Sequence, residues 1–425
     1  MTNTSQPFEI TPEILGLENI EIINVKLNSA GEFIIEVKST QSETYCHKCG
    51  KVCKKHGHGQ KMKLRHLPIL GRKCFIEIRP PRGICEHCDQ NPTTTQILPW
   101  YNRNGRYTKT FEQSVLFALI NSTITDVSIK EDLGTHAIQN IVDRHIDNKV
   151  DWKDFKKLGI IGIDEISLKK GYQDYMTIIT SRVHDKITLL SLIKGREKAD
   201  IEAFFETIPN KQRKTIIAVC SDMYDGFINA AKTVFGKNIP IVVDRFHVAK
   251  LYRKRFTELR TKELARLRKV LSAEEYKELK LAISILKRNK EFASKKEQQE
   301  LGKLFKHSPL LKVAYRYCQK LTIIFNTKHK KDTANQKMKE WIAAVEKSEL
   351  TCFNSFITTL TKYQDEITNY FLKRHNSGFV EGFNNKVKVI KRRCYGIFNL
   401  KHFFQRIFLD ASGYEKIQLN QYVTA

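Results

Sequence analysis

The order of apolar segments between residues 159 and 244 limits the fold of this chain more than any other feature. Five short segments rich in β-branched or other apolar residues predict buried strands: 159–164, 175–180, 187–193, 215–220 and 239–243. Two segments between the last three strands carry apolar residues at helical spacing, 201–208 and 227–235. The sequence therefore predicts three strands in succession, followed by a helix, a strand, a helix and a strand.

Three antiparallel strands followed by alternating helices and parallel strands are typical of the ribonuclease-H-like fold. After Asp244 the strand patterns stop, and residues 246–374 predict helices only. We therefore expect an α/β ribonuclease-H-like core formed by residues 151–245 and 375–415. A basic, all-helical insertion of residues 246–374 would split that core.

Charge indicates the kind of partner. The chain carries 73 Lys and Arg against 46 Asp and Glu, a formal net charge of +27. Such an excess favours a polyanion, because phosphate neutralisation releases counterions; solubility alone is the alternative explanation. Residues 245–270 hold ten of these cations. We expect this segment to form a DNA-facing surface, and a helical face exposed only to solvent is the alternative. No apolar run approaches the roughly 18 residues of a membrane span, and residues 1–9 lack the pattern of a secretory signal, so we expect an intracellular protein.

Three acidic residues stand in apolar or glycine-rich surroundings: Asp164, Asp222 and Glu381. Asp164 is expected at the end of the first strand and Asp222 just beyond the fourth. These strands are neighbours in the ribonuclease-H-like order, so the two carboxylates would lie side by side. Glu165 would point to the opposite face, because side chains alternate along a strand. Taken singly, each acid also has a plain structural explanation, as a strand end, a helix cap or an exposed helical position.

Glu381 is expected near the start of a helix whose apolar face consists of Val380, Phe383, Val387 and Ile390. The other side carries Glu381, Asn384, Lys388, Lys391 and Arg392, with Arg393 directly after. This side would bring a carboxylate to a metal site and cations to a DNA backbone, which Lys and Arg bind without reading sequence. Three carboxylates suffice for two Mg²⁺ ions, with Mn²⁺ able to substitute, because Mg²⁺ prefers oxygen ligands and keeps several waters.

A cysteine cluster precedes the core: six of the ten Cys lie between Cys46 and Cys88. In a reducing compartment such clustering indicates metal binding rather than disulfides. The pairs Cys46, Cys49 and Cys85, Cys88 are Cys-x-x-Cys knuckles with the spacing of a tetrahedral, structural Zn²⁺ site. Further candidate ligands are Cys53, His56, His58 and Cys74, and free buried Cys is the alternative.

Residues 1–100 are therefore assigned to a β and zinc-binding module. Alternating apolar residues predict a hairpin over 18–38. A second hairpin, over 64–70 and 74–78 with Gly71 at the turn, lies between the knuckles and would bring them together.

Residues 101–150 predict a helix-turn-helix. A helix with apolar residues at helical spacing precedes a shorter one over 124–132, a turn at Gly134, and a helix that opens at Thr135 as N-cap. In that last helix the DNA-binding candidates are Gln139, Asn140 and Arg144. A plain helical spacer is the alternative, because any two short helices joined by a glycine turn give this pattern.

Several longer motifs accompany these residues: His66-Leu67-Pro68, Arg82-Gly83-Ile84-Cys85, Gly162-Ile163-Asp164-Glu165, Ser221-Asp222-Met223-Tyr224, Val243-Asp244-Arg245-Phe246-His247-Val248, the segment 376–388, the segment 391–396, and Phe398. Together they resemble the DDE transposases of the bacterial ISL3 insertion-sequence family over nearly the whole chain. The segment around Glu381 is the most specific part of the resemblance.

By matching position, the resemblance implies that Asp164, Asp222 and Glu381 form the catalytic triad and hold Mg²⁺. Residues 244–247 also resemble an Asp/Cys-x-x-His signature of related transposase groups, in which it supports the active site without holding metal. Asp244 and His247 are therefore expected as supporting residues, or else as a capping Asp and a packed His.

The expected function is transposition. The N-terminal modules would bind the terminal inverted repeats of an insertion sequence, and the core would cleave the ends and join the freed 3′-OH groups to target DNA. Two ends must be joined, so we expect at least a homodimer on double-stranded DNA, in the cytoplasm of a bacterium and associated with the nucleoid, with no membrane partner. The alternatives are a domesticated or inactive relative that regulates by sequence-specific binding, and a nuclease without strand transfer. The intact acidic residues argue against the regulator.

Overall fold

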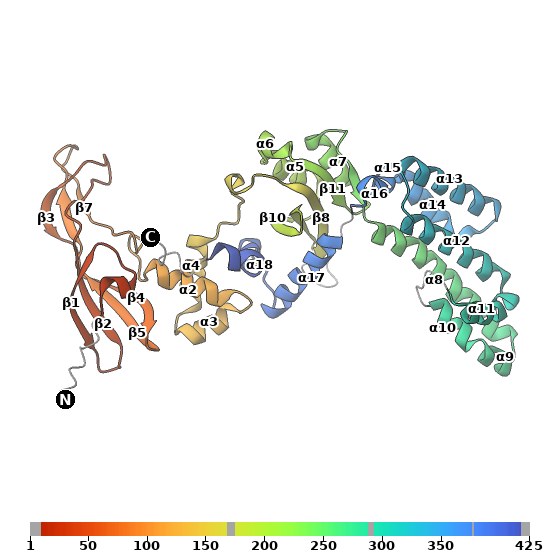
Figure 1. Cartoon of the computed structure of the whole chain (residues 1–425), viewed down its shortest axis with the longest axis horizontal. Coiled ribbons are helices and arrows are strands. Elements are labelled where there is room, and N and C mark those ends of the chain that lie inside the picture. The colour runs from red at the N-terminus through yellow and green to blue at the C-terminus, as the bar shows by residue number, and fades with distance from the viewer. Residues whose placement is uncertain (1–9, 168–174, 288–292, 376–377, 418–425) are drawn as a thin grey trace, which may run out of the picture. The chain divides into compact units, whose positions relative to one another are not determined.

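The structure, a computed structural model, describes residues 10–167, 175–287, 293–375 and 378–417 (Figure 1). Its contacts divide the chain into two compact units. Unit 1 comprises residues 1–147 and 405–425, and unit 2 comprises residues 148–404. This boundary differs from the expected one, which counted 375–415 with the α/β core, because helix α18 (Leu400–Lys416) buries its second half against the helices of unit 1.

Both predicted hairpins are present in unit 1, after a short helix α1 (Pro12–Leu15). Strands β1 (Ile20–Leu27) and β2 (Phe33–Ser39) form the first, and β4 (Met62–Ile69) and β5 (Arg72–Ile78) form the second. They make one sheet in the order β1-β2-β5-β4, in which β2 and β5 run parallel. Alternate residues such as Ile35, Leu64 and Ile76 are buried on one face, as half-buried strands require.

The helix-turn-helix pattern is also present, as α2 (Lys109–Leu119), α3 (Ile124–Glu131) and α4 (Thr135–His145). Thr123 and Asp126 form a capping box at the start of α3. The sequence predicted Thr135 as the N-cap of α4. Thr135 is instead the first residue of the helix, because the extended backbone ends at Gly134, which is the N-cap. Helix α18 completes this group: Arg406 donates to the carbonyl of Leu119, and Leu409 joins the helical core.

His66 connects the sheet to these helices and has an unusual environment. It lies on β4, its Nδ1 is 2.9 Å from Thr108 Oγ1, and its side chain is almost fully buried. Burial lowers the pKa of His66 to about 4. The folded protein therefore keeps this ring neutral at a pH where an unfolded chain is already protonated.

We predict that unit 1 loses stability as the pH falls through the ordinary pKa of histidine, because the unfolded chain takes up the proton first. With folded and unfolded pKa values of about 4 and 6.5, the loss between pH 8 and pH 5 is about 2 kcal/mol. Hydrogen exchange of β4 and β5 peptides, corrected for intrinsic rates, should show this loss in the wild type and not in His66→Gln. The exposed His56→Gln should behave as wild type; equal pH dependence in all three proteins would contradict the prediction.

The sheet of unit 2 has the predicted order of elements. Its strands are β8 (Gly159–Ser167), β9 (Tyr175–Val183), β10 (Lys186–Lys194), β11 (Ile216–Ser221) and β12 (Ile241–Val243). They lie in the order β10-β9-β8-β11-β12. Strands β8, β9 and β10 are antiparallel, whereas β11 runs parallel to both β8 and β12. Unit 2 thus contains a mixed sheet in an α/β arrangement, and β8 and β11 are neighbours as predicted.

The helices of this sheet lie on both of its faces. Figure 1 shows α5 (Lys198–Glu206), α6 (Asn210–Arg213) and α7 (Asp225–Phe235) on one side and α17 (Gly378–Arg393) on the other. Phe205 and Phe227 extend from α5 and α7 into the core of the unit. The sequence predicted that Asp164 ends the first strand of this sheet. In the structure, β8 continues to Ser167. Pairing with β11 stops at Gly162, whereas pairing with β9 continues through Ser167.

The predicted helical insertion is present between β12 and α17. Its helices are α8 (Arg245–Val270), α9 (Ala273–Glu278), α10 (Lys280–Lys287), α11 (Lys295–His307), α12 (Pro309–Asn326), α13 (Lys331–Lys347), α14 (Asn354–Lys362), α15 (Gln364–Thr368) and α16 (Tyr370–Lys373). These helices share one core with the sheet, and Asn369 donates to the carbonyl of Ile241 in β12. Within the described ranges, none of the helices has the length and apolar character to cross a membrane.

Candidate active site and metal centre

Four thiols meet in unit 1. The Sγ atoms of Cys46, Cys49, Cys85 and Cys88 all lie within 4.8 Å of one another. Cys46 and Cys88 are 3.9 Å apart, and Cys49 and Cys85 are 3.6 Å apart. A tetrahedral ZnS₄ centre with Zn–S bonds of about 2.3 Å has sulfur–sulfur edges of about 3.8 Å. The donor set and its spacing therefore fit zinc.

Strand pairing brings these knuckles together, but not through the hairpin between them that the sequence predicted. Strand β3 (Lys54–His58) follows the first knuckle, and β6 (Pro81–Ile84) precedes the second. Lys54 pairs with Ile84, so the knuckles lie at the same end of a small sheet that β7 (Thr93–Thr95) completes. The β4–β5 hairpin instead belongs to the larger sheet.

The thiols are poised for a cation. Hydrogen bonds from the backbone N–H groups of Cys49 and Lys48 lower the pKa of Cys46 to about 6. In contrast, the hydrogen bond with Cys49 and partial burial raise the pKa of Cys88 to about 12. The cluster therefore accepts one negative charge readily and resists the next until a cation offsets it. Of the other candidate ligands, Cys53 lies beside the cluster, Cys74 lies in the separate core of the larger sheet, and His56 and His58 are exposed on β3.

We predict that Cys85→Ser removes zinc from the purified chain and unfolds the β3–β6–β7 sheet, because three thiolates no longer close the tetrahedron. Metal analysis should find zinc in the wild type and little in the variant. Cys74→Ser is the matched control, since it also removes a buried thiol and should retain zinc. Equal zinc in both variants would contradict the assignment.

Asp164 and Asp222 lie at the same level of the sheet in unit 2. Cys220 pairs with Gly162, and two residues further along each strand stand Asp222 and Asp164. Burial, followed by the charge of Asp222, raises the pKa of Asp164 to about 6. Two carboxylates in this arrangement repel each other unless a cation lies between them. The expected proximity of these two residues is therefore present.

Helix α17 packs on β8 beside Asp164. A Cβ atom at Gly162 would come within 2.4 Å of Val380 and 2.7 Å of Thr180, so only glycine permits this approach. One turn after Val380, Asn384 donates from Nδ2 to Asp164 Oδ2. The sequence predicted that Asn384 lies on the polar side of the helix. In the structure Asn384 is buried, because its side chain is directed at Asp164. The apolar face of α17 is otherwise as predicted.

His247 contacts the second carboxylate. Its Nδ1 lies 2.6 Å from Asp222 Oδ1, and this hydrogen bond raises the pKa of His247. Asp244, three residues earlier, caps α8 by accepting from the N–H of Phe246. Asp244 therefore acts as the N-cap of α8, whereas His247 contacts Asp222 directly.

Two oxygen atoms near these residues have no hydrogen-bond partner among the residues that the structure describes. They are Asp244 Oδ2 and Asn384 Oδ1, both buried. Buried oxygens without donors are costly unless a cation or ordered water satisfies them. Together with the raised pKa of Asp164, this oxygen-rich surrounding fits a hard divalent ion.

Glu381 has a looser placement. It lies three residues before Asn384, so the two side chains are neighbours on the surface of α17, but Glu381 is partly exposed whereas Asn384 is buried. Within the described residues, the thiol cluster is the only group of three or more metal-ligand side chains whose donor atoms come within 4.8 Å of each other. The structure therefore brings Glu381 to the same edge of the sheet but not into a closed triad. Residues 376 and 377 of the motif lie outside the described part.

Two neighbouring acids have other partners. Glu165 contacts Arg196 at 3.5 Å, and Asp225 accepts hydrogen bonds from Lys362 and Tyr363. Arg196 was not recognised from the sequence, where nothing distinguishes it from other exposed cations. Its guanidinium lies 5.1 Å from the ring of Tyr224, two residues after Asp222.

The DNA-binding candidates differ in accessibility. Lys388 and Arg392 are exposed on α17, and Lys391 and Arg393 are partly buried. On α4, Asn140 is exposed, but Gln139 donates to Asp143 and Gln405. Arg144 forms an ion pair with the buried Glu112. The exposed His136, one turn before Asn140, is a candidate that the sequence analysis did not select.

Comparison with known proteins identifies the family. A family model described as a transposase matches residues 161–407. A model of the helix-turn-helix domain of transposase family ISL3 matches residues 96–146. The chain belongs to the ISL3 family of transposases. It is thus a DNA-binding DNA transposase, an enzyme of metal-dependent polynucleotidyl transfer, which confirms the expected family, reaction class and helix-turn-helix domain.

Two individual proteins are similar to this transposase. The transposase for insertion sequence element IS1001 of Bordetella parapertussis is 26% identical over 374 residues, which is 88% of this chain and 90% of the relative. Among solved structures, the Drosophila P element transposase strand transfer complex has a TM-score of 0.42 and 11% identity, covering 72% of this chain and 92% of that chain.

We predict that Gly162→Ala impairs the transposase by forcing α17 away from β8. The added methyl group would overpack the interface, which typically costs about 1–3 kcal/mol, and would separate Asn384 from Asp164. DNA cleavage should fall about tenfold or more, while binding by unit 1 persists. Gly382→Ala is the matched control, because it adds the same methyl group to α17 with nothing within 4 Å. Wild-type cleavage by Gly162→Ala would refute the role of this packing.

Proposed function

We propose that this transposase binds the terminal inverted repeats of its insertion sequence, cleaves them with two Mg²⁺ ions and joins the 3′-OH ends to target DNA. The strand order β10-β9-β8-β11-β12, with three antiparallel and then parallel strands, supports a ribonuclease-H-like core. In this proposal residues 151–245 and 375–404 make the catalytic core, while 405–415 pack with unit 1. Residues 246–374 form the insertion, 101–150 the helix-turn-helix domain and 1–100 the zinc-binding module.

One observation carries the proposal: Asp164 and Asp222 lie level on adjacent strands, and α17 returns to them after the insertion. A hydrogen bond between residues 220 positions apart holds the helix of Glu381 against the strand of Asp164. In this proposal these three distant segments together supply the carboxylates of one site. A protein that only bound DNA would have no need of it.

The residues then have distinct tasks. Asp164, Asp222 and Glu381 would supply carboxylate oxygens to Mg²⁺, for which Mn²⁺ could substitute. When bound, the two ions would stabilise the attacking and leaving oxygens of an in-line displacement at phosphorus. Asn384 orients Asp164, and His247 orients Asp222.

Binding residues extend the site towards DNA. Glu381, Lys388 and Arg392 follow one another along a single side of α17 over about 16 Å. The cations would hold phosphates next to the scissile bond, aided by Lys391 and Arg393. Asn140, and Gln139 and Arg144 after release from their present partners, would contact bases or backbone in the major groove.

The remaining parts position the ends. Structural Zn²⁺ at the four thiols would hold the small sheet of unit 1, and the helix-turn-helix would recognise the repeat. A homodimer would be required on DNA, because two transposon ends must react with one target.

We predict that Asp164→Asn, Asp222→Asn and Glu381→Gln each lower cleavage and joining about a thousandfold, because each removes roughly 4 kcal/mol of transition-state stabilisation. Binding of the terminal repeat should remain within about twofold. Asp225→Asn is the control, since its carboxylate pairs with Lys362 and Tyr363 instead.

The assay uses labelled terminal-repeat DNA, Mg²⁺ and a supercoiled target plasmid. Joined product supports transposition. Cleavage without joining would instead favour a nuclease, and binding without cleavage a regulator. Full cleavage by Glu381→Gln would overturn the assignment of the third acid alone.

A further inference from the structure

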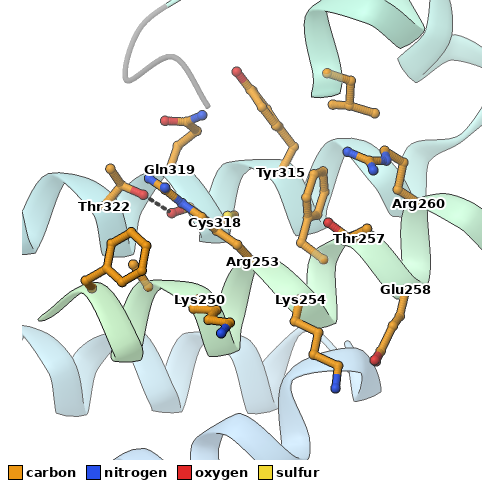
Figure 2. Close-up of a pocket in the computed structure, with 14 residues that line it drawn as sticks. Lys250, Arg253, Lys254, Thr257, Glu258, Arg260, Tyr315, Cys318, Gln319 and Thr322 are labelled. Carbon is orange, nitrogen blue, oxygen red and sulfur yellow. Dashed lines mark hydrogen bonds between the residues drawn. The ribbon is translucent and has the colours of Figure 1, made fainter. Parts of the chain in front are cut away.

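A cavity opens beside the proposed active site, between α8 and α12 of the insertion. Its volume is about 540 Å³, a size typical of small-ligand sites. Figure 2 shows Lys250, Arg253, Lys254 and Arg260 of α8 on its border and Tyr315 of α12 in its wall. Neither the family match nor the acidic site assigns a role to it.

The cavity has an unbalanced positive charge. Its four cations, Lys250, Arg253, Lys254 and Arg260, form no ion pair with a carboxylate in the described part of the chain. The lining contains one acid, Glu258, which pairs with Arg255 at 2.9 Å. Burial lowers the pKa of Arg260, with no carboxylate to offset the lost hydration. An anionic ligand would relieve both the repulsion and the desolvation.

Aromatic rings accompany these charges. Phe246 is 52% exposed, although it is large and apolar, and its ring centroid lies 6.2 Å from that of His247. Tyr315 lines the cavity and is partly buried, and its ring centroid lies 6.1 Å from that of Phe256 and 5.7 Å from that of Phe305. Rings beside cations suit a nucleotide, whose base stacks while its phosphate binds charge.

Two of the four cations of the cavity lie on the face of α8 that carries His247. His247, Lys250 and Lys254 succeed one another on one face of α8, at helical spacing from the Asp222 contact. The distance along the axis from His247 to Arg260 is about 20 Å, at 1.5 Å per residue. A stacked strand presents one phosphate about every 3.4 Å, so a strand leaving the site along α8 would pass several cations.

We propose that this cavity binds unpaired nucleotides of the DNA substrate, next to the scissile phosphate. Their phosphates contact Arg253, Lys254 and Arg260, and a base stacks on Phe246 or Tyr315. The inference rests on the proposed function, because it takes the strand from the cleaved transposon end. It adds a second binding mode, since duplex recognition alone does not need an aromatic cavity.

The test measures binding of the full chain without divalent metal, so that it does not depend on cleavage. The probes are a blunt terminal-repeat duplex and the same duplex with a single-stranded extension at the cleavage end. Arg253→Gln with Arg260→Gln should weaken binding of the extended DNA about tenfold and change the blunt duplex less than about twofold. The salt dependence on the extended DNA should fall by about 1.4 in slope, for two lost contacts to a single strand.

The matched control is Lys262→Gln with Arg268→Gln, which removes the same charge from exposed positions of α8 outside the cavity. It should leave the preference for extended DNA intact. Equal losses in both double variants, or on both DNAs, would overturn the proposal in favour of general electrostatic attraction.

Stacking is tested separately with 2-aminopurine in the extension. Its fluorescence should be quenched by the wild type and recover in Phe246→Leu with Tyr315→Leu, while blunt-duplex binding stays unchanged. Free deoxyadenosine triphosphate is the other arm: if it binds this cavity and the variants leave extended DNA unaffected, the site serves a free nucleotide and the proposal is wrong. Inactivity of the Asp164 variant, by contrast, bears only on the proposed catalysis.

Discussion

The structure of unit 2 depends on one close contact, the packing of α17 on β8 at Gly162. The missing side chain allows Val380 to reach the strand, and the next turn places Asn384 on Asp164. Without this approach the chain beyond the insertion would have no fixed position on the sheet. The insertion can therefore be long, because its two ends are anchored independently. Helix α8 begins directly after β12 with Asp244 as its N-cap, and Asn369 donates a hydrogen bond to β12 before α17.

The same constraint explains how far the sequence could predict this site. Three features depend only on the spacing of residues close in sequence, and all three were predicted correctly. They are the order of strands and helices, the Cys-x-x-Cys knuckles and the apolar face of α17. The burial of Asn384 was not, since it depends on a strand 220 residues away. The sequence also placed Asp164 at the end of its strand, whereas it lies within β8. Strand β8 pairs with β11 only as far as Gly162 but with β9 as far as Ser167, and local patterns do not reveal this difference.

Unit 1 shows the same limit. The four thiols were selected from their spacing, but the pairing that joins them, β3 with β6, lies outside the hairpin that local patterns suggested. Gln139 and Arg144 were selected as DNA-binding candidates, yet Gln139 contacts α18 and Arg144 contacts the buried Glu112. No pattern within α4 reveals a helix that arrives from residue 400 onward.

The electrostatics of unit 2 follow from how its acids are held. Asp164 and Asp222 are each tied by one side chain, Asn384 and His247, while Glu381 contacts no partner in the described chain. Under the proposed assignment, the fold sets two ligands in advance and leaves the third to be drawn in with metal and DNA. Helix α8 then joins two opposite charge environments: its first turn carries the histidine that orients a carboxylate. Its next turns carry Lys250, Arg253 and Lys254, which form no ion pair with an acid in the described part of the chain, although the neighbouring Arg255 pairs with Glu258. A polyanionic strand bound along α8 is thereby led towards the carboxylates, which would otherwise repel it, and this requires the cation-rich turns to follow His247 directly.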